Sequence, residues 1–180
     1  MPPSFSVIVP TYGRPEYLRA AVDSVLAQTV DDLECIVVDD ATPIPVPRPS
    51  QDPRVRLVSR ARNGGPAAAR NSGLQAATGT YVAFLDDDDV WVPDRLEQAL
   101  DQHRRAPLVV CFQSVVGGSL DARGRQLEGD VADSILDSIT PHLGATTCAR
   151  DDLLRFDETY RACEDVEWWL RIAQHARVAT

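Results

Sequence analysis

Short apolar runs rich in β-branched residues alternate with amphipathic segments along this chain, and this alternation restricts the fold more than any other feature. FSVIV at Phe5–Val9 ends before Pro10, Pro15 opens a segment with apolar residues at helical spacing, and ECIVV at Glu34–Val38 is a second apolar run. A strand, a helix and a strand in this order form a βαβ unit with parallel strands. The sequence therefore predicts an α/β fold with a mostly parallel central sheet flanked by helices.

The same alternation continues along the rest of the chain. Five prolines between positions 42 and 53 favour an extended loop, because proline lacks the amide hydrogen that a helix needs. No repeat or linker divides the sequence, so we expect one domain over residues 1–180. Strands are predicted at 55–58, 81–85 and 108–116, an extended segment at 144–149, a polar loop at 117–129, and helices at 66–77, 93–105, 131–138 and 164–175.

The charged residues exclude several classes of phosphate chemistry. The formal net charge is −9, and all 18 basic residues are Arg. A P-loop, a Schiff base and a protein kinase site each need Lys, so these classes are excluded. The pI of about 4.7 argues against nucleic acid as a partner. Any phosphate ligand must be held by Arg, backbone amides or a metal ion.

Cysteine spacing and hydropathy give no sign of secretion. The four Cys lie far apart without a CxxC pair, so neither a zinc site nor a disulfide framework is indicated. Cys35 and Cys111 lie in apolar runs and are expected to be buried thiols. The first residues lack the features of a signal peptide, and no apolar run is long enough for a transmembrane segment. We therefore expect a cytoplasmic protein.

Asp86–Asp89 directly follow the predicted strand YVAFL. Two such charges about 4 Å apart repel by roughly 4 kcal/mol at an effective dielectric constant of 20. A solvated turn that caps the next helix would explain one or two of these acids. A hard divalent cation at the sheet edge would relieve the repulsion, and oxygen ligands favour Mg²⁺ or Mn²⁺ over Zn²⁺. The run therefore predicts a metal site.

Other polar residues stand near neighbouring strand ends, where ligands bind in parallel α/β sheets. Asp39 and Asp40 would either form an Asx turn or accept hydrogen bonds from a nucleobase or ribose. Tyr12 follows the first strand and would either pack or stack on a base. The turn at 63–66 and Arg70 would place amides and a guanidinium at a helix start, which suits an anion but also fits an ordinary loop.

The last predicted helix begins with two acids and contains two adjacent tryptophans. Glu164 and Asp165 would complement the helix dipole in its first turn. Trp168 and Trp169 would point about 100° apart on a helix. We therefore expect that they do not share one core patch, and that one of them lines a ligand cleft or a partner surface.

Four segments in this order resemble family 2 glycosyltransferases with the GT-A fold: VIVPTYGRPEYLRAAVDSVLAQT, ECIVVDDAT, NGGPAAARNSGLQAATGTYVAFLDDDD and ACEDVEWWLRIA. The resemblance implies a Rossmann-like nucleotide-binding half and an inverting transferase that uses a nucleotide-diphosphate sugar, most commonly a UDP-sugar. The donor part would span about 1–115. The acceptor and catalytic-base part would span about 116–180, with a C-terminus that is truncated or minimal compared with other members.

The resemblance also implies which residues contact the donor. Thr11 and Tyr12 match residues that contact the nucleoside. Asp40 matches the acid that binds the base edge, with Asp39 beside it. Arg70 matches an Arg that contacts the nucleotide.

The acidic run matches the Asp-any-Asp motif of the family. Asp88 and Asp86 match its two acids and are the expected metal ligands, with Mn²⁺ or Mg²⁺ as the cofactor. Asp86 or Asp87 would contact the ribose. The cation would lie between Asp88 and the two phosphates and would neutralise the leaving nucleoside diphosphate.

Asp165 matches the general base of the family. It would take the proton from the acceptor hydroxyl as that oxygen attacks the anomeric carbon, and one displacement of this kind inverts the carbon. Glu164 and Trp168 are expected at the substrate. The acceptor stays open among glycans, lipid-linked glycans, small molecules and carrier-bound metabolites, and the sequence leaves room for a homo-oligomer.

Two other functions fit parts of the pattern. A sugar-phosphate nucleotidyltransferase has a related sheet and a metal ion, but it needs a Gly-rich basic loop after the first strand. Pro10–Gly13 offers one Gly and no Lys. A non-catalytic or truncated domain could instead bind a nucleotide sugar as an interaction module, which intact Asp88 and Asp165 argue against.

Overall fold

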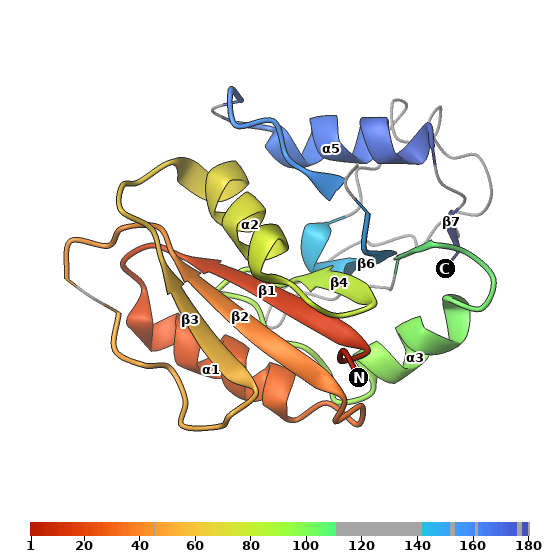
Figure 1. The fold of residues 1–180 in the computed structure, drawn as a ribbon, viewed down its shortest axis with the longest axis horizontal. Coiled ribbons are helices and arrows are strands. Elements are labelled where there is room, and N and C mark those ends of the chain that lie inside the picture. The colour runs from red at the N-terminus through yellow and green to blue at the C-terminus, as the bar shows by residue number, and fades with distance from the viewer. Residues whose placement is uncertain (45, 111–141, 152–153, 161, 176–177, 180) are drawn as a thin grey trace, which may run out of the picture.

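The computed structural model describes residues 1–44, 46–110, 142–151, 154–160, 162–175 and 178–179. These residues form one sheet of seven strands, in the order β3-β2-β1-β4-β6-β5-β7, with helices on both faces (Figure 1). The strands are β1 (Phe5–Thr11), β2 (Leu33–Asp39), β3 (Val55–Ser59), β4 (Tyr81–Phe84), β5 (Leu108–Val110), β6 (Thr146–Ala149) and β7 (Val178–Ala179). The helices are α1 (Pro15–Leu26), α2 (Gly65–Ala76), α3 (Arg95–Gln102) and α5 (Glu164–Ala173), and η1 (Leu143–Ala145) is a 3₁₀ turn.

The sheet is mostly parallel, as the sequence predicts. Strands β3, β2, β1 and β4 pair in parallel, and β7 is parallel to β5. Strand β6 is antiparallel to both β4 and β5. The chain runs outward from β1 through β2 to β3 and then returns to place β4 on the other side of β1. The strand order therefore reverses between β1 and β4, which is where open α/β sheets bind ligands.

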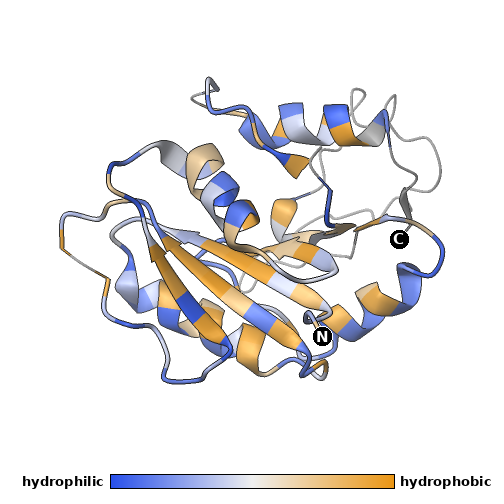
Figure 2. Cartoon of the chain, viewed as in Figure 1, coloured by the Kyte–Doolittle hydropathy of each residue, from blue (hydrophilic) through white to orange (hydrophobic). Residues whose placement is uncertain are grey.

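The central strands are buried on both faces, so alternate residues enter two different cores. Val7 and Val9 of β1 pack in the cluster that includes Leu18 of α1 and Leu96 of α3. Ile8 packs in the opposite cluster, with residues of α2 and α5. Figure 2 shows the hydrophobic residues that run along these strands. Two-sided burial explains why β1 and β2 are continuous apolar runs rather than alternating ones.

Two local features fix the helices on the sheet. Pro15 lies in the first turn of α1, where its missing amide hydrogen costs nothing, and the buried residues of α1 recur at helical spacing. Helix α2 packs close to β1 because Gly73 has no side chain. A Cβ at Gly73 would lie 2.4 Å from Cγ2 of Ile8.

Glu34 of β2 links the neighbouring strands β1 and β3 and the segment after α2. Its Oε1 accepts hydrogen bonds from Oγ of Ser6 at 2.7 Å and from both the amide and the hydroxyl of Thr78 at 2.7 Å. Its Oε2 pairs with Arg56 at 2.8 Å. Burial alone would raise the pKa of Glu34, but these hydrogen bonds outweigh it and hold the pKa below its usual value.

Several predicted boundaries change in the structure. The helix expected from position 93 begins at Arg95, because the carbonyl of Pro93 accepts a hydrogen bond from the amide of Thr29. The extended segment expected at 144–149 is confirmed only for β6, since η1 occupies its first two positions. The helix expected to reach 175 ends at Ala173.

Other expectations fall partly outside the described residues. The strand predicted at 108–116 is described only as β5, and the loop at 117–129, the helix at 131–138 and Cys111 lie outside the described residues. Cys35 is buried as predicted, and burial raises the pKa of its thiol to about 12. Within the described ranges, no helix has the length and apolar character needed to cross a membrane.

Candidate active site

A cavity of about 590 Å³ opens beyond the carboxyl ends of β1 and β4, where the strand order reverses. It brings together most of the residues that the sequence singled out, from five separate segments of the chain. Its lining residues are Pro10, Thr11, Tyr12, Arg14, Asp40, Asn63, Gly65, Pro66, Ala69, Arg70, Asp86, Asp87, Asp88 and Glu164. Of the predicted site residues, Asp39, Asp165 and Trp168 do not line it.

Thr11 and Tyr12 stand at the end of β1 but face different surroundings. Thr11 is buried, and its Oγ1 donates a hydrogen bond of 2.6 Å to Oδ2 of Asp87. Tyr12 is 49% exposed and lines the cavity, so its ring is accessible to a ligand. Thr11 therefore positions an acid, whereas Tyr12 offers a surface for stacking.

Asp39 is the last residue of β2 and Asp40 follows it, and the two acids make different contacts. Oδ1 of Asp39 accepts a hydrogen bond of 2.9 Å from the amide of Thr42, which is the Asx-type contact that the sequence left open. Asp40 accepts hydrogen bonds from the amides of Gly64 and Gly65, the latter at 2.7 Å, and pairs with Arg60 at 2.8 Å. Asp40 thus ties β2 to the start of α2 while lining the cavity.

Asp87 and Asp88 share one cation, Arg14. The guanidinium of Arg14 lies 2.6 Å from Oδ1 of Asp87 and 2.6 Å from Oδ2 of Asp88. Asp87 has no exposed side-chain surface, whereas Asp88 is 46% exposed. Burial raises the pKa of Asp87, although the hydrogen bond from Thr11 and the charge of Arg14 oppose this shift.

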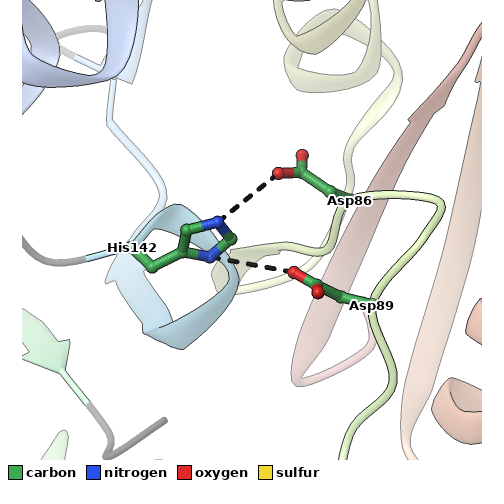
Figure 3. A group of neighbouring side chains, drawn as sticks. All are labelled: Asp86, Asp89 and His142. Atoms are coloured by element: carbon green, nitrogen blue, oxygen red, sulfur yellow. Dashed lines mark ion pairs between the residues drawn. The ribbon is translucent and has the colours of Figure 1, made fainter. Parts of the chain in front are cut away.

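The other two acids of the run face His142 (Figure 3). Nε2 of His142 lies 3.8 Å from Oδ2 of Asp86, and its Nδ1 lies 3.8 Å from Oδ2 of Asp89. One ligand atom from each of the three residues falls within 4.8 Å of the others, a spacing that could hold a metal ion. Two carboxylate oxygens and an imidazole nitrogen fit a divalent transition metal such as Mn²⁺. Burial raises the pKa of Asp89, and the charge of His142 opposes that shift.

Arg70 connects the acidic run to the last helix. Its guanidinium donates to Oδ1 of Asp86 at 2.9 Å and to Oε1 of Glu164 at 2.8 Å. Its side chain is 7% exposed, and it also lies 5.5 Å from the ring centroid of Phe156. Asp165 follows Glu164 in the first turn of α5 and is partly buried, with its Oδ1 accepting from the amide of Val166 at 2.9 Å.

The expectation that Trp168 and Trp169 cannot share a core patch was wrong. Both indoles are fully buried in one apolar cluster, at 5.5 Å between their ring centroids. Trp168 stacks on Phe156 and donates from Nε1 to the carbonyl of Leu154 at 2.8 Å. The segment around Leu154 packs along the helix, so α5 is covered on more than one side. Trp168 therefore has no surface that reaches the cavity.

Sequence reasoning missed Arg14 and His142 and did not single out Asp89 within its run. Arg14 lies three residues after Thr11, so its position near the end of the first strand could have been predicted from the sequence. His142 carries no local signal, because its approach to Asp86 and Asp89 depends on η1 lying beside β4.

Residues 6–151 match a profile of the family described as "Glycosyl transferase family 2". The succinoglycan biosynthesis protein ExoW of Rhizobium meliloti is 41% identical over 121 residues, which cover 63% of this chain and 38% of the relative. An uncharacterized glycosyltransferase of Rickettsia felis is 30% identical over 184 residues, which cover 93% of this chain and 30% of the relative. The chain therefore spans well under half the length of these relatives.

Two solved structures share the fold. Residues 1–349 of S. aureus TarS, in complex with UDP-GlcNAc, superpose with a TM-score of 0.79 at 24% identity and cover 98% of this chain and 55% of that one. The mannosyltransferase PcManGT from Pyrobaculum calidifontis, in complex with GDP-Man and Mn²⁺, gives a TM-score of 0.75 at 23% identity, covering 100% of this chain and 55% of that one.

Proposed function

Because this chain belongs to glycosyl transferase family 2, we propose that it transfers a sugar from a nucleotide-diphosphate sugar, most commonly a UDP-sugar, to an acceptor hydroxyl with inversion of the anomeric carbon. The observation that carries this proposal is the cavity between the ends of β1 and β4. It joins the acids that follow β2 and β4 with Glu164, the neighbour of the expected base. We propose that residues of about 1–115 bind the donor and that residues of about 116–180 bind the acceptor and carry the catalytic base.

The donor nucleotide occupies the cavity in this proposal. Tyr12 stacks on the base, since its ring is half exposed at the cavity wall. Asp40 accepts from the base edge, and Asp39 holds the turn beside it through Thr42. Arg70 supplies a fixed cation near the phosphates, because its guanidinium is buried between two acids.

A divalent cation fits the residues beside the cavity. Asp86, Asp89 and His142 would hold it, whereas Asp88, the ligand expected from the Asp-any-Asp motif, pairs with Arg14 in the structure and would join them only after leaving that pair. Bound there, Mn²⁺ or Mg²⁺ would neutralise charge on the departing diphosphate. PcManGT is described as a complex with Mn²⁺, which supports the choice of metal by analogy of fold.

Asp165 acts as the general base. Its carboxylate takes the proton of the acceptor hydroxyl while that oxygen forms a bond to the anomeric carbon. The bond from the anomeric carbon to the diphosphate breaks, and its electron pair leaves with the nucleoside diphosphate. Glu164 positions this base, because its ion pair with Arg70 fixes the first turn of α5 near the cavity. Trp168 does not contact the substrate in this proposal; it is buried in the core and holds α5 in place.

Thermal unfolding with single nucleoside diphosphates, each with and without Mn²⁺, tests the proposal. We expect one nucleotide to raise Tm, and to do so only when the metal is present. At 100 times its Kd, this nucleotide should raise the free energy of unfolding by about 2.7 kcal/mol. Asp86→Asn should lose this response, whereas Asp23→Asn, on the exposed side of α1, should keep it. No response to any nucleotide would contradict the proposal.

A second measurement separates catalysis from binding alone. We expect nucleotide-sugar turnover, followed as release of nucleoside diphosphate, in the presence of glycan or lipid-linked acceptors. Binding without any release, across acceptors of each class, would favour the non-catalytic module instead.

A further inference from the structure

Arg14 is placed where its charge opposes the stability of its own helix. It precedes Pro15 at the start of α1, and its side chain makes no capping hydrogen bond. The free amides at a helix N-terminus carry a partial positive charge, so a cation there is disfavoured. An Asp or Ser at this position would cap the helix better. A cation suits this position because it pairs with two acids that follow β4, Asp87 and Asp88.

Arg14 and Arg70 hold the acids of the cavity in different ways. Arg70 is 7% exposed, and its two terminal nitrogens pair with Asp86 and Glu164. Arg14 is 47% exposed and pairs with Asp87 and Asp88, of which Asp88 is itself 46% exposed. Both cations line the same cavity. Only the Arg14–Asp88 pair can open without burying an unpaired charge.

We propose that Arg14 is an exchangeable counter-cation, which holds Asp88 while the cavity is empty and turns to the diphosphate when donor and metal bind. This inference rests on the proposed function. A divalent cation that arrives alone must compete with Arg14 for Asp88. A cation that arrives with a diphosphate brings negative oxygens, to which the planar guanidinium can transfer its hydrogen bonds.

Arg14 therefore couples metal binding to nucleotide binding. The Arg14–Asp88 pair weakens binding of the metal when the metal arrives alone. It does not weaken binding of the metal when a nucleoside diphosphate binds at the same time. The coupling is reciprocal, because each ligand changes the affinity of the other by the same factor.

Titration with Mn²⁺ alone, followed by the electron paramagnetic resonance signal of free Mn²⁺, tests this role without any turnover. We expect Arg14→Gln to tighten binding of Mn²⁺ alone by about fivefold, the scale of a half-exposed ion pair. The same variant should weaken binding of UDP in the presence of Mn²⁺. Arg19→Gln removes an equal charge from α1, the helix that Arg14 precedes, where Arg19 pairs with Asp23, and should leave both affinities close to wild type.

The Asp88→Asn background decides whether the effect passes through that acid. We expect Arg14→Gln to give no tightening of Mn²⁺ binding when Asp88 is Asn, because the competition has been removed. Equal tightening in both backgrounds would show a general charge effect and overturn the proposal. Unchanged Mn²⁺ affinity in Arg14→Gln would also overturn it, even where UDP still binds with metal. Failure of wild type to bind any nucleoside diphosphate would instead contradict the proposed function.

Discussion

The guanidinium of Arg70 lies 2.8 Å from Oε1 of Glu164, and this ion pair joins α2 to the first turn of α5. The two residues are far apart in the sequence, and both are largely buried. The same guanidinium holds Asp86 at 2.9 Å. One cation thus connects the acids that follow β4 with the helix that carries Asp165.

Replacing Arg70 should destabilise the protein strongly. Arg70→Gln leaves two carboxylates close together without their cation, and we expect a loss of about 3 kcal/mol in the free energy of unfolding. Urea denaturation measures this loss. Arg19→Gln breaks an exposed ion pair within α1 and should cost only about 0.3–0.5 kcal/mol. Similar losses in the two variants would mean that Arg70 does not hold α5.

Asp165→Asn should abolish transfer and spare donor binding. An amide cannot take the acceptor proton, so we expect the turnover rate to fall by about 10²–10⁴-fold while Kd for the nucleoside diphosphate stays unchanged. Glu167→Gln is the control, because Glu167 is an acid of the same first turn of α5 whose carboxylate is paired with Arg171. Wild-type turnover in Asp165→Asn would remove Asp165 from the role of base.

His142→Ala should weaken metal binding. The variant deletes one of three candidate ligands, and we expect the Kd for Mn²⁺ in the presence of UDP to rise by at least about tenfold. His175→Ala is the matched control, since His175 is an exposed residue just after α5. If both variants bind Mn²⁺ equally well, the cluster of Asp86, Asp89 and His142 is not the metal site.

His103 should make the folded state sensitive to mild acid. Its ring stacks on that of Tyr81, with 3.9 Å between the ring centroids. Burial lowers the pKa of His103 to about 4 from its usual value of 6.5. The unfolded chain therefore binds a proton between pH 6.5 and 4 that the folded state does not. Stability is fully present above pH 6.5 and is lost as the pH falls towards 4.

Comparison with His103→Gln isolates this contribution. We expect wild type to lose about 1–2 kcal/mol more than His103→Gln between pH 7 and pH 4, after allowance for the partial exposure of the ring. Urea denaturation at several pH values gives the difference. His175→Gln removes a histidine at the surface and controls for the unfolded state. Parallel pH profiles of wild type and His103→Gln would contradict the prediction.

Apolar runs that are buried on both faces made the sheet predictable. β1 and β2 carry no polar side of their own, so their sequences could only belong to central strands. The acids after β2 and β4 were predictable as neighbours, since parallel strands end at one edge. Those features led to Tyr12, Asp40 and Asp86–Asp88, all of which line one cavity.

Contacts that depend on tertiary packing could not be predicted in this way. His142 meets Asp86 and Asp89 only because η1 leads into β6, which pairs antiparallel with β4. Trp168 and Trp169 diverge on α5, yet the chain near Leu154 and Phe156 packs against the helix and buries both. The angle between two side chains on a helix predicts different surroundings only when one side of that helix is buried. It gives the wrong answer for α5, because the chain covers α5 on more than one side.

Trp91 differs from the other two of the three tryptophans. Trp168 and Trp169 are sealed in the core, so their surroundings stay the same whatever enters the cavity. The ring of Trp91 is partly exposed, with Arg95 4.3 Å from its centroid and its Nε1 donating to the carbonyl of Gly144. It is thus bonded to η1, the turn that His142 caps, and stands two residues after Asp89 in the chain. Intrinsic fluorescence should therefore report occupancy of the site through a single indole over a constant background, without any attached dye.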